Sequence, residues 1–166
     1  MSKPQPHRTN FEVVRNGLNE TTRRELNRPR HWRGLTIIDA SLLAIWVRDH
    51  HHQIGELHTD VVCGLVPTLF GPLATAANRA AVQRLHPLRI DACAWFMNHW
   101  WVLECKPAAG HKAFGQVISY AYWAARGNDR LIDCKLGIIT DSAQAIIRPV
   151  CDQNRVTLFE LYACSP

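Results

Sequence analysis

Apolar and polar positions change their spacing near the middle of the chain. Up to Pro87 the apolar residues recur mostly at helical spacing, and Gly and Pro residues separate the segments. The apolar segment 35–47 predicts a buried helix with a polar end over residues 48–52. The helices predicted in this half cover residues 11–27, 35–47, 56–69 and 73–85.

After Pro87 the pattern becomes mixed, with extended runs and one clear helix. The predicted elements are a hairpin of strands 88–95 and 100–107, a helix over 111–126, strands over 135–140 and 156–161, and a partly helical segment over 142–154. Gly127 supplies a stop for the helix. This order predicts an α/β fold, with a central mixed β-sheet flanked by helices.

Charge is distributed unevenly along the 166 residues. Residues 1–34 contain eight basic and three acidic side chains, so they hold the whole net charge of +5, and the rest of the chain is formally neutral. We therefore predict an N-terminal basic, partly helical arm over 1–34 and a single domain over 35–166. Such an arm favours contact with phosphate, so a polyanion is the expected partner. A protein partner or a homo-oligomer formed through the arm is the alternative.

Composition limits the class of protein. With 47% hydrophobic and 20% charged residues, the chain has the profile of one globular domain. Its apolar stretches are interrupted well before 18 residues, so we expect no membrane span. Six widely spaced cysteines without a C-x-x-C motif indicate reduced thiols and a cytoplasmic location, in a host cytoplasm or a virion if the chain is viral.

The candidate chemistry lies in the predicted hairpin. If Trp95 pairs with Trp100, Asp91 falls directly opposite Glu104 on the neighbouring strand. Opposed side chains of an antiparallel pair have Cβ atoms about 5 Å apart. Two carboxylates at that separation repel each other, and a divalent cation between them removes the conflict.

The next residues extend this pattern. Alternation along a strand places Lys106 on the same face as Glu104 and the Cys105 side chain on the opposite face. The chain has a second acid-x-Lys sequence at Asp133 and Lys135, but no acid is expected opposite it. The expected acid on the neighbouring strand therefore distinguishes Glu104-x-Lys106 from Asp133-x-Lys135.

This arrangement resembles the PD-(D/E)XK nuclease superfamily, in which an Asp on one strand and (Asp/Glu)-x-Lys on the next form a metal-dependent phosphodiesterase site. The resemblance covers about residues 88–140. Gln116 and Tyr120 on the following helix are similar to the Gln-x-x-x-Tyr element of the RecB-type exonuclease branch. Ile90 stands where the proline of the superfamily name would be.

The resemblance implies a restriction-endonuclease-like core and a nuclease that hydrolyses DNA phosphodiester bonds with Mg²⁺ or Mn²⁺. It implies that Asp91, Glu104 and the backbone carbonyl of Cys105 ligate the ion. It also implies that Lys106 positions and activates the attacking water. Gln116 and Tyr120 would hold the phosphate or nucleotide.

Members of the superfamily often carry another acid or a histidine on a helix before the hairpin. We expect Glu56 to be this additional ligand, with His58 as the rival. Both lie in the predicted helix 56–69, but no spacing rule fixes either one.

Structural interpretations compete with the catalytic one. Asp91, Glu104 and Lys106 could form a charge cluster on a solvated sheet face. Gln116 and Tyr120 could be the polar edge of an amphipathic helix. The corresponding functional alternative is a non-catalytic nucleic-acid-binding or assembly protein of a virus or mobile element that retains the nuclease fold.

The tryptophans of the hairpin also allow two interpretations. Their rings could stack on nucleobases, but hydrophobic packing is the favoured role. We expect Trp101 to face the core, and Trp95 and Trp100 to lie nearer the site.

Overall fold

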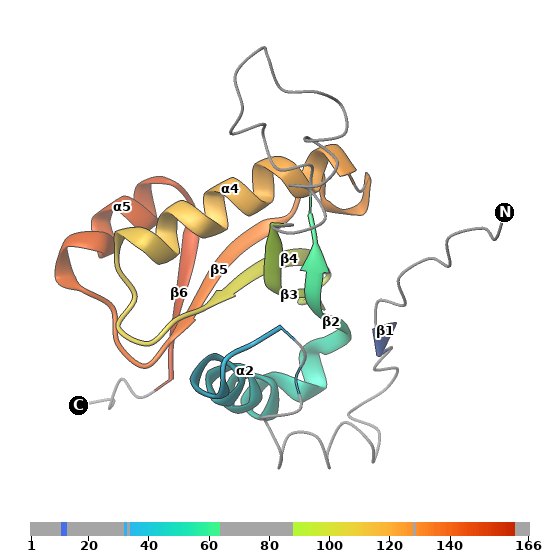
Figure 1. Ribbon diagram of the computed structural model, residues 1–166, viewed down its shortest axis with the longest axis horizontal. Coiled ribbons are helices and arrows are strands. Elements are labelled where there is room, and N and C mark those ends of the chain that lie inside the picture. The colour runs from blue at the N-terminus through green and yellow to red at the C-terminus, as the bar shows by residue number, and fades with distance from the viewer. Residues whose placement is uncertain (1–10, 13–31, 33, 64–87, 128, 162–166) are drawn as a thin grey trace, which may run out of the picture.

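The computed structural model describes residues 11–12, 32, 34–63, 88–127 and 129–161 (Figure 1). The predicted helix 73–85 lies outside these residues, as does most of the predicted helix 11–27 and of the basic arm. The described start of the predicted helix 11–27, residues 11–12, forms a short strand instead, because it pairs with a neighbouring strand of the sheet. None of the helices in the described ranges is long and apolar enough to cross a lipid bilayer.

The structure is an α/β fold built on a mixed sheet. Its five longer strands are β2 (Ile54–Val62), β3 (Arg89–Phe96), β4 (His99–Cys105), β5 (Lys135–Thr140) and β6 (Val156–Glu160), and the two-residue strand β1 (Phe11–Glu12) pairs with β2. The strands lie in sequence order across the sheet. Strands β1 to β4 are antiparallel, whereas β4, β5 and β6 run parallel.

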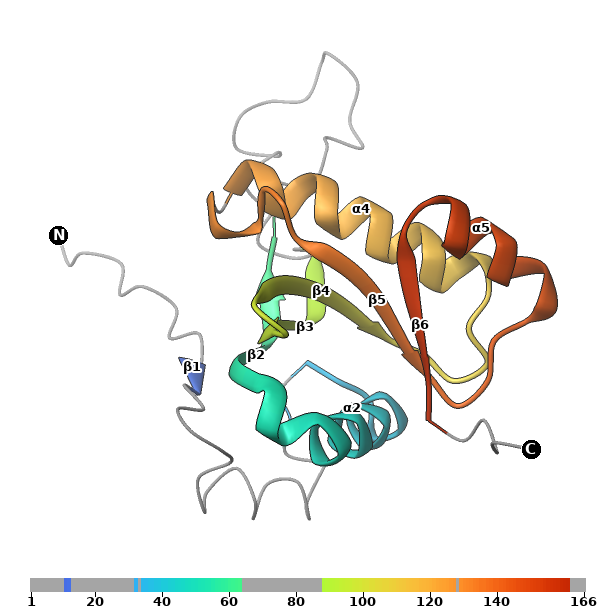
Figure 2. The same cartoon turned by 180° about the vertical axis from the view of Figure 1, so that it is seen from behind.

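Helices cover both faces of the sheet, as predicted. Helix α2 (Ile37–His50) lies on one face, and α4 (His111–Gly127) and α5 (Arg148–Gln153) lie on the other (Figures 1 and 2). The parallel steps from β4 to β5 and from β5 to β6 need crossover connections, which contain α4 and α5. The central strand β4 is buried from Trp101 to Cys105 because it is covered on both faces.

Within the described ranges, three 3₁₀ segments extend or connect these elements. They are η2 (His51–Gln53), η3 (Asp129–Leu131) and η4 (Ala145–Ile147). Helices α2, α4 and α5 and strands β5 and β6 lie close to the residue ranges that the sequence pattern predicts. The segment 142–154 is partly helical, as expected.

The hairpin of β3 and β4 has the predicted register. Trp95 pairs with Trp100, and the turn residues Met97 and Asn98 both have positive φ, 50° and 61°. Positive φ at both central residues is what the commonest two-residue hairpin turn requires. Trp101 is buried in the core beneath α2, while Trp95 is exposed.

The prediction of a helix over residues 56–69 is wrong for its described part. Residues Ile54–Val62 form β2, which is hydrogen-bonded to β3 along most of its length. The sequence 57–62 alternates weakly and suits either state, so the partner strand β3 decides its conformation. Because β3 begins at Arg89, that partner is far away in the sequence.

The predicted arm contributes a tryptophan to the hydrophobic core. Trp32 is 8% exposed and packs in the hydrophobic cluster that contains Trp46 of α2 and Phe96 of β3. Trp46 and Phe96 meet edge to face, with ring centroids 5.0 Å apart. The core therefore extends into the C-terminal end of the segment 1–34.

Candidate functional site

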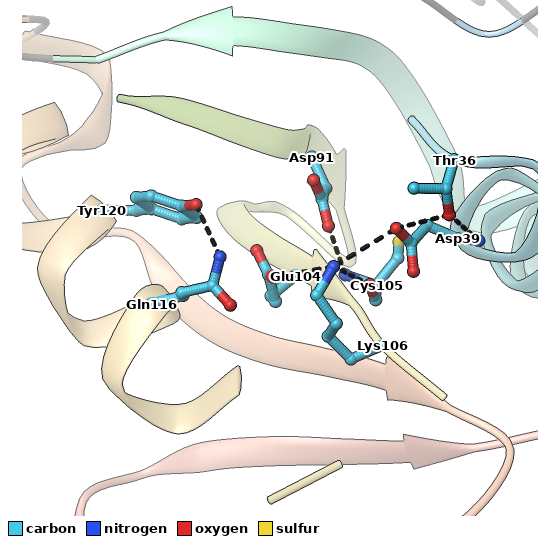
Figure 3. A network of polar contacts seen from close by, with 8 residues as sticks. All are labelled: Thr36, Asp39, Asp91, Glu104, Cys105, Lys106, Gln116 and Tyr120. Atoms are coloured by element: carbon cyan, nitrogen blue, oxygen red, sulfur yellow. Dashed lines mark hydrogen bonds and ion pairs between the residues drawn. The ribbon is translucent and has the colours of Figure 1, made fainter. Parts of the chain in front are cut away.

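Asp91 joins the ends of the two hairpin strands. Ala92 pairs with Leu103, and extending this register by one residue sets Asp91 opposite Glu104. The backbone N–H of Cys105 donates a hydrogen bond of 2.8 Å to Asp91 Oδ2 (Figure 3). Burial raises the pKa of Asp91, and this hydrogen bond and the charge of Lys106 oppose the increase.

Glu104 is a buried carboxyl group. Its side chain is fully buried, and neither carboxyl oxygen meets hydrogen-bond geometry with a described residue, although Oε1 forms an ion pair with Lys106 Nζ at 3.5 Å. Burial and the neighbouring Asp91 raise its pKa to about 8, while Lys106 acts in the opposite direction. The alternative of a solvated charge cluster does not describe this side chain.

Lys106 lies among three oxygen atoms. Its Nζ is 3.2 Å from Asp39 Oδ2, 3.2 Å from the backbone oxygen of Cys105 and 3.5 Å from Glu104 Oε1 (Figure 3). Burial alone lowers the pKa of the ammonium group, but the carboxylates of Glu104, Asp91 and Asp39 outweigh it and raise the pKa. Lys106 is therefore charged at neutral pH.

The backbone beyond β4 is held by β5. The N–H of Lys106 donates to the carbonyl of Ile139 at 3.0 Å, which continues the parallel pairing by one residue. The N–H of Ala108 donates to Asp141 Oδ1 at 2.9 Å. These contacts fix the segment from which both the Lys106 side chain and the start of α4 project.

Asp39 is the site residue that the sequence analysis missed. It lies in the first turn of α2 and is 5% exposed. Thr36 caps this helix: its Oγ1 accepts from the N–H of Asp39 at 3.2 Å and donates to Asp39 Oδ2 at 2.8 Å. The Thr-x-x-Asp spacing could have located the helix start, but not its position beside Lys106.

Gln116 and Tyr120 come from α4. Gln116 Nε2 donates to the hydroxyl of Tyr120 at 3.0 Å, and both side chains lie on the side of Glu104 away from Asp39 (Figure 3). Gln116 Oε1 is buried without a hydrogen-bond partner among the described residues. Burial and the charge of Glu104 raise the pKa of Tyr120 to about 12, so its hydroxyl stays protonated.

Glu56 and His58 lie on a strand, contrary to the expectation of a helix. Glu56 pairs with Trp95 near the hairpin turn, four residues along β3 from Asp91, or about 13 Å. Its Oε1 is 2.5 Å from His58 Nε2, and the His58 ring lies 5.8 Å from that of Trp100. Asp39 rather than Glu56 is the additional acid that reaches Lys106, because α2 begins against this part of the sheet whereas Glu56 lies near the hairpin turn.

The donor set of the site contains two carboxylates and one carbonyl. No group of three or more His, Cys, Asp or Glu side chains suited to a metal ion occurs within the described ranges. Asp91, Glu104 and the Cys105 carbonyl nevertheless fit a small divalent cation. All are hard oxygen donors, and both Glu104 oxygens are buried without hydrogen bonds inside the described structure.

Comparison of the chain with family models, with curated proteins and with solved structures gives no match.

Proposed function

We propose that this chain is a metal-dependent nuclease that hydrolyses DNA phosphodiester bonds on a restriction-endonuclease-like core. One observation carries the proposal. Asp91, Glu104 and Lys106 meet at the same end of adjacent strands, around a fully buried carboxyl group whose charged neighbour is Lys106, 3.5 Å from Glu104 Oε1. Their order, Asp on one strand and Glu-x-Lys on the next, resembles the PD-(D/E)XK pattern.

Asp91, Glu104 and the backbone carbonyl of Cys105 would hold Mg²⁺ or Mn²⁺. When bound, such an ion polarises a phosphoryl oxygen and lowers the pKa of a coordinated water. Asp91 is oriented for this role by the N–H of Cys105. Glu104 projects from β4 as a buried side chain beside Lys106.

Lys106 and Tyr120 supply donors on two sides of Glu104. The Lys106 ammonium can orient the attacking water and stabilise negative charge on the phosphate. The Tyr120 hydroxyl accepts a hydrogen bond from Gln116, so its own proton is available for a phosphate oxygen. Both groups are in the protonated form that these roles require at neutral pH.

Asp39 supports the same assignment. The superfamily resemblance implies an additional acid on a helix before the hairpin, and Asp39 on α2 satisfies that description where Glu56 on β2 does not. The mixed sheet with helices on both faces is consistent with the proposed core.

A cleavage assay with matched acid variants tests the proposal. Linear and circular DNA are incubated with Mg²⁺ or Mn²⁺ and the wild-type protein, Glu104→Gln or Asp133→Asn. Asp133 is an exposed acid in the second acid-x-Lys sequence and serves as the control. We expect metal-dependent cleavage that Glu104→Gln lowers about 100-fold or more and Asp133→Asn leaves unchanged. Equal cleavage by wild type and Glu104→Gln would contradict the proposal.

A thermal melt separates the nuclease from a non-catalytic protein with the same fold. An ion that binds only the folded state must raise the apparent Tm. We expect Mn²⁺ to raise the Tm of the wild type but not that of Glu104→Gln. A wild-type Tm that ignores Mn²⁺ would favour the nucleic-acid-binding or assembly alternative.

A further inference from the structure

The Lys106 ammonium contacts oxygens that belong to the proposed metal site. Two of its three oxygen neighbours are the Cys105 carbonyl, at 3.2 Å, and Glu104 Oε1, at 3.5 Å. The third is Asp39 Oδ2 on α2, at 3.2 Å. One cation already lies against the oxygens that a divalent ion would use.

We propose that Lys106 and the divalent cation compete for these oxygens, and that the site takes up the ion together with a phosphodiester that receives the displaced ammonium. This inference rests on the proposed nuclease function. It assigns to Lys106 control of metal loading in addition to its role toward the phosphate.

Charge and distance make the two cations mutually exclusive in this position. A metal–oxygen bond to Mg²⁺ is about 2.1 Å long, so an ion on Glu104 and the Cys105 carbonyl would lie only a few ångströms from the Lys106 nitrogen. Like charges at such a distance, away from water, repel strongly. The ammonium must therefore withdraw from these two oxygens when the ion binds.

The side chain has a path by which to withdraw. Lys106 is 28% exposed, and its four-carbon stem can turn toward solvent. Asp39 retains the ammonium near the site, because its carboxylate is itself fixed by the Thr36 hydroxyl at 2.8 Å. A phosphate oxygen arriving at the metal offers the displaced ammonium a new anionic partner.

Reciprocal coupling between metal and phosphodiester follows from this competition. The ion binds only those molecules in which the Lys106 ammonium has left these oxygens. The apparent metal affinity is therefore the intrinsic affinity multiplied by the fraction of such molecules. A phosphodiester that binds the displaced ammonium raises that fraction, and the metal raises phosphodiester affinity by the same factor. The free protein then loads metal weakly.

Calorimetric titration with Mn²⁺ tests the competition. The proteins are wild type, Lys106→Met, Lys106→Gln, Lys135→Met and Glu104→Gln, each with and without diethyl phosphate, a phosphodiester that resists cleavage. We expect both Lys106 variants to bind Mn²⁺ about tenfold more tightly than wild type, whereas Lys135→Met does not. Diethyl phosphate should tighten Mn²⁺ binding by a larger factor in the wild type than in the Lys106 variants, where only its direct contact with the ion remains.

Two controls separate the possible explanations. The first control repeats the Mn²⁺ titrations in 0.5 M KCl, because salt screens repulsion between exposed charges but does not remove direct competition for shared oxygens. The difference in Mn²⁺ affinity between wild type and the Lys106 variants should therefore persist in 0.5 M KCl. Circular dichroism melts establish that both Lys106 variants fold.

The contrary outcomes are distinguishable. If wild type and the Lys106 variants bind Mn²⁺ with equal affinity and Glu104→Gln does not bind it, the metal site is supported but the competition is wrong. Mn²⁺ binding that is absent from every protein, or unaffected by Glu104→Gln, would overturn the proposed function and this inference with it.

Discussion

Lys106 at the end of β4 contacts Asp39 in the first turn of α2, 67 residues earlier, with Nζ 3.2 Å from Oδ2. This ion pair connects the helix on one face of the sheet to the Glu-x-Lys sequence of the central strand. Because Asp39 also bonds the helix-capping Thr36, the start of α2 and the candidate site share one polar network.

Because of this ion pair, substitutions of two acids of α2 should differ in their effect on the free energy of unfolding. Asp39→Asn keeps an oxygen for Thr36 but removes the charge facing Lys106, so we expect the free energy of unfolding to fall by about 1–2 kcal/mol. Asp49→Asn, which affects an exposed pair with Arg48, should cost less than about 0.5 kcal/mol. Urea denaturation at pH 7 measures both. Equal losses would show that the Asp39 contact does not stabilise the fold.

The two roles of Asp91 can be separated by substitution. Asp91→Asn retains an oxygen that accepts from the N–H of Cys105, so we expect stability to change little and the Mn²⁺-induced increase in Tm to disappear. Asp91→Leu also leaves that N–H without its partner, and should lower the free energy of unfolding by about 1–3 kcal/mol. Denaturation with and without Mn²⁺ distinguishes these effects. A Mn²⁺ response retained in Asp91→Asn would remove Asp91 from the ligand set.

Glu104 predicts a specific pH dependence of stability. Its pKa is near 4.3 in the unfolded chain and about 8 in the folded protein, so folding favours the protonated form. The metal-free protein should therefore lose stability as the pH rises from about 4.5 through about 8, because the folded state must then ionise a buried group. Glu104→Gln has no carboxyl group to ionise at this position, so it should lack this pH-dependent loss of stability.

Urea denaturation in EDTA between pH 5 and 8.5 measures the difference between Glu104→Gln and wild type. The variant should gain stability relative to wild type as the pH increases across that range. A difference that does not change with pH would contradict a raised pKa for Glu104.

Tyr120 predicts a loss of activity without a large loss of stability. Tyr120→Phe preserves packing under α4 but removes the hydroxyl that Gln116 orients, so we expect kcat/KM for cleavage to fall about tenfold. The free energy of unfolding should change by less than about 1 kcal/mol. Tyr122→Phe, at an exposed position of the same helix, is the matched control. Equal kcat/KM values for the two variants would argue against a role for the Tyr120 hydroxyl.

The hairpin could be predicted from the sequence because the residues that determine it are close together along the chain. Alternation along each strand and the two-residue turn fix the pairing of Trp95 with Trp100, and that register places Asp91 opposite Glu104. The contact between Gln116 and Tyr120 is local for the same reason, since residues four apart are neighbours on a helix.

The errors concern residues whose positions depend on distant partners. Glu56 was expected on a helix because its own segment has no decisive period, and pairing with β3 makes that segment a strand. Asp39 was missed because the Thr-x-x-Asp cap marks where α2 begins but says nothing about which part of the sheet the helix meets.

The sequence alone thus determined the α/β class, the hairpin register and the placement of two carboxylates and a lysine on neighbouring strands, because these follow from periodicity and turn chemistry. Only the tertiary structure decided that Glu104 is buried with neither oxygen hydrogen-bonded to a described residue, and that Lys106 lies between Asp39 and the Cys105 carbonyl. Those properties depend on α2 and α4 packing on opposite faces of β4, and such packing joins residues that no local pattern relates.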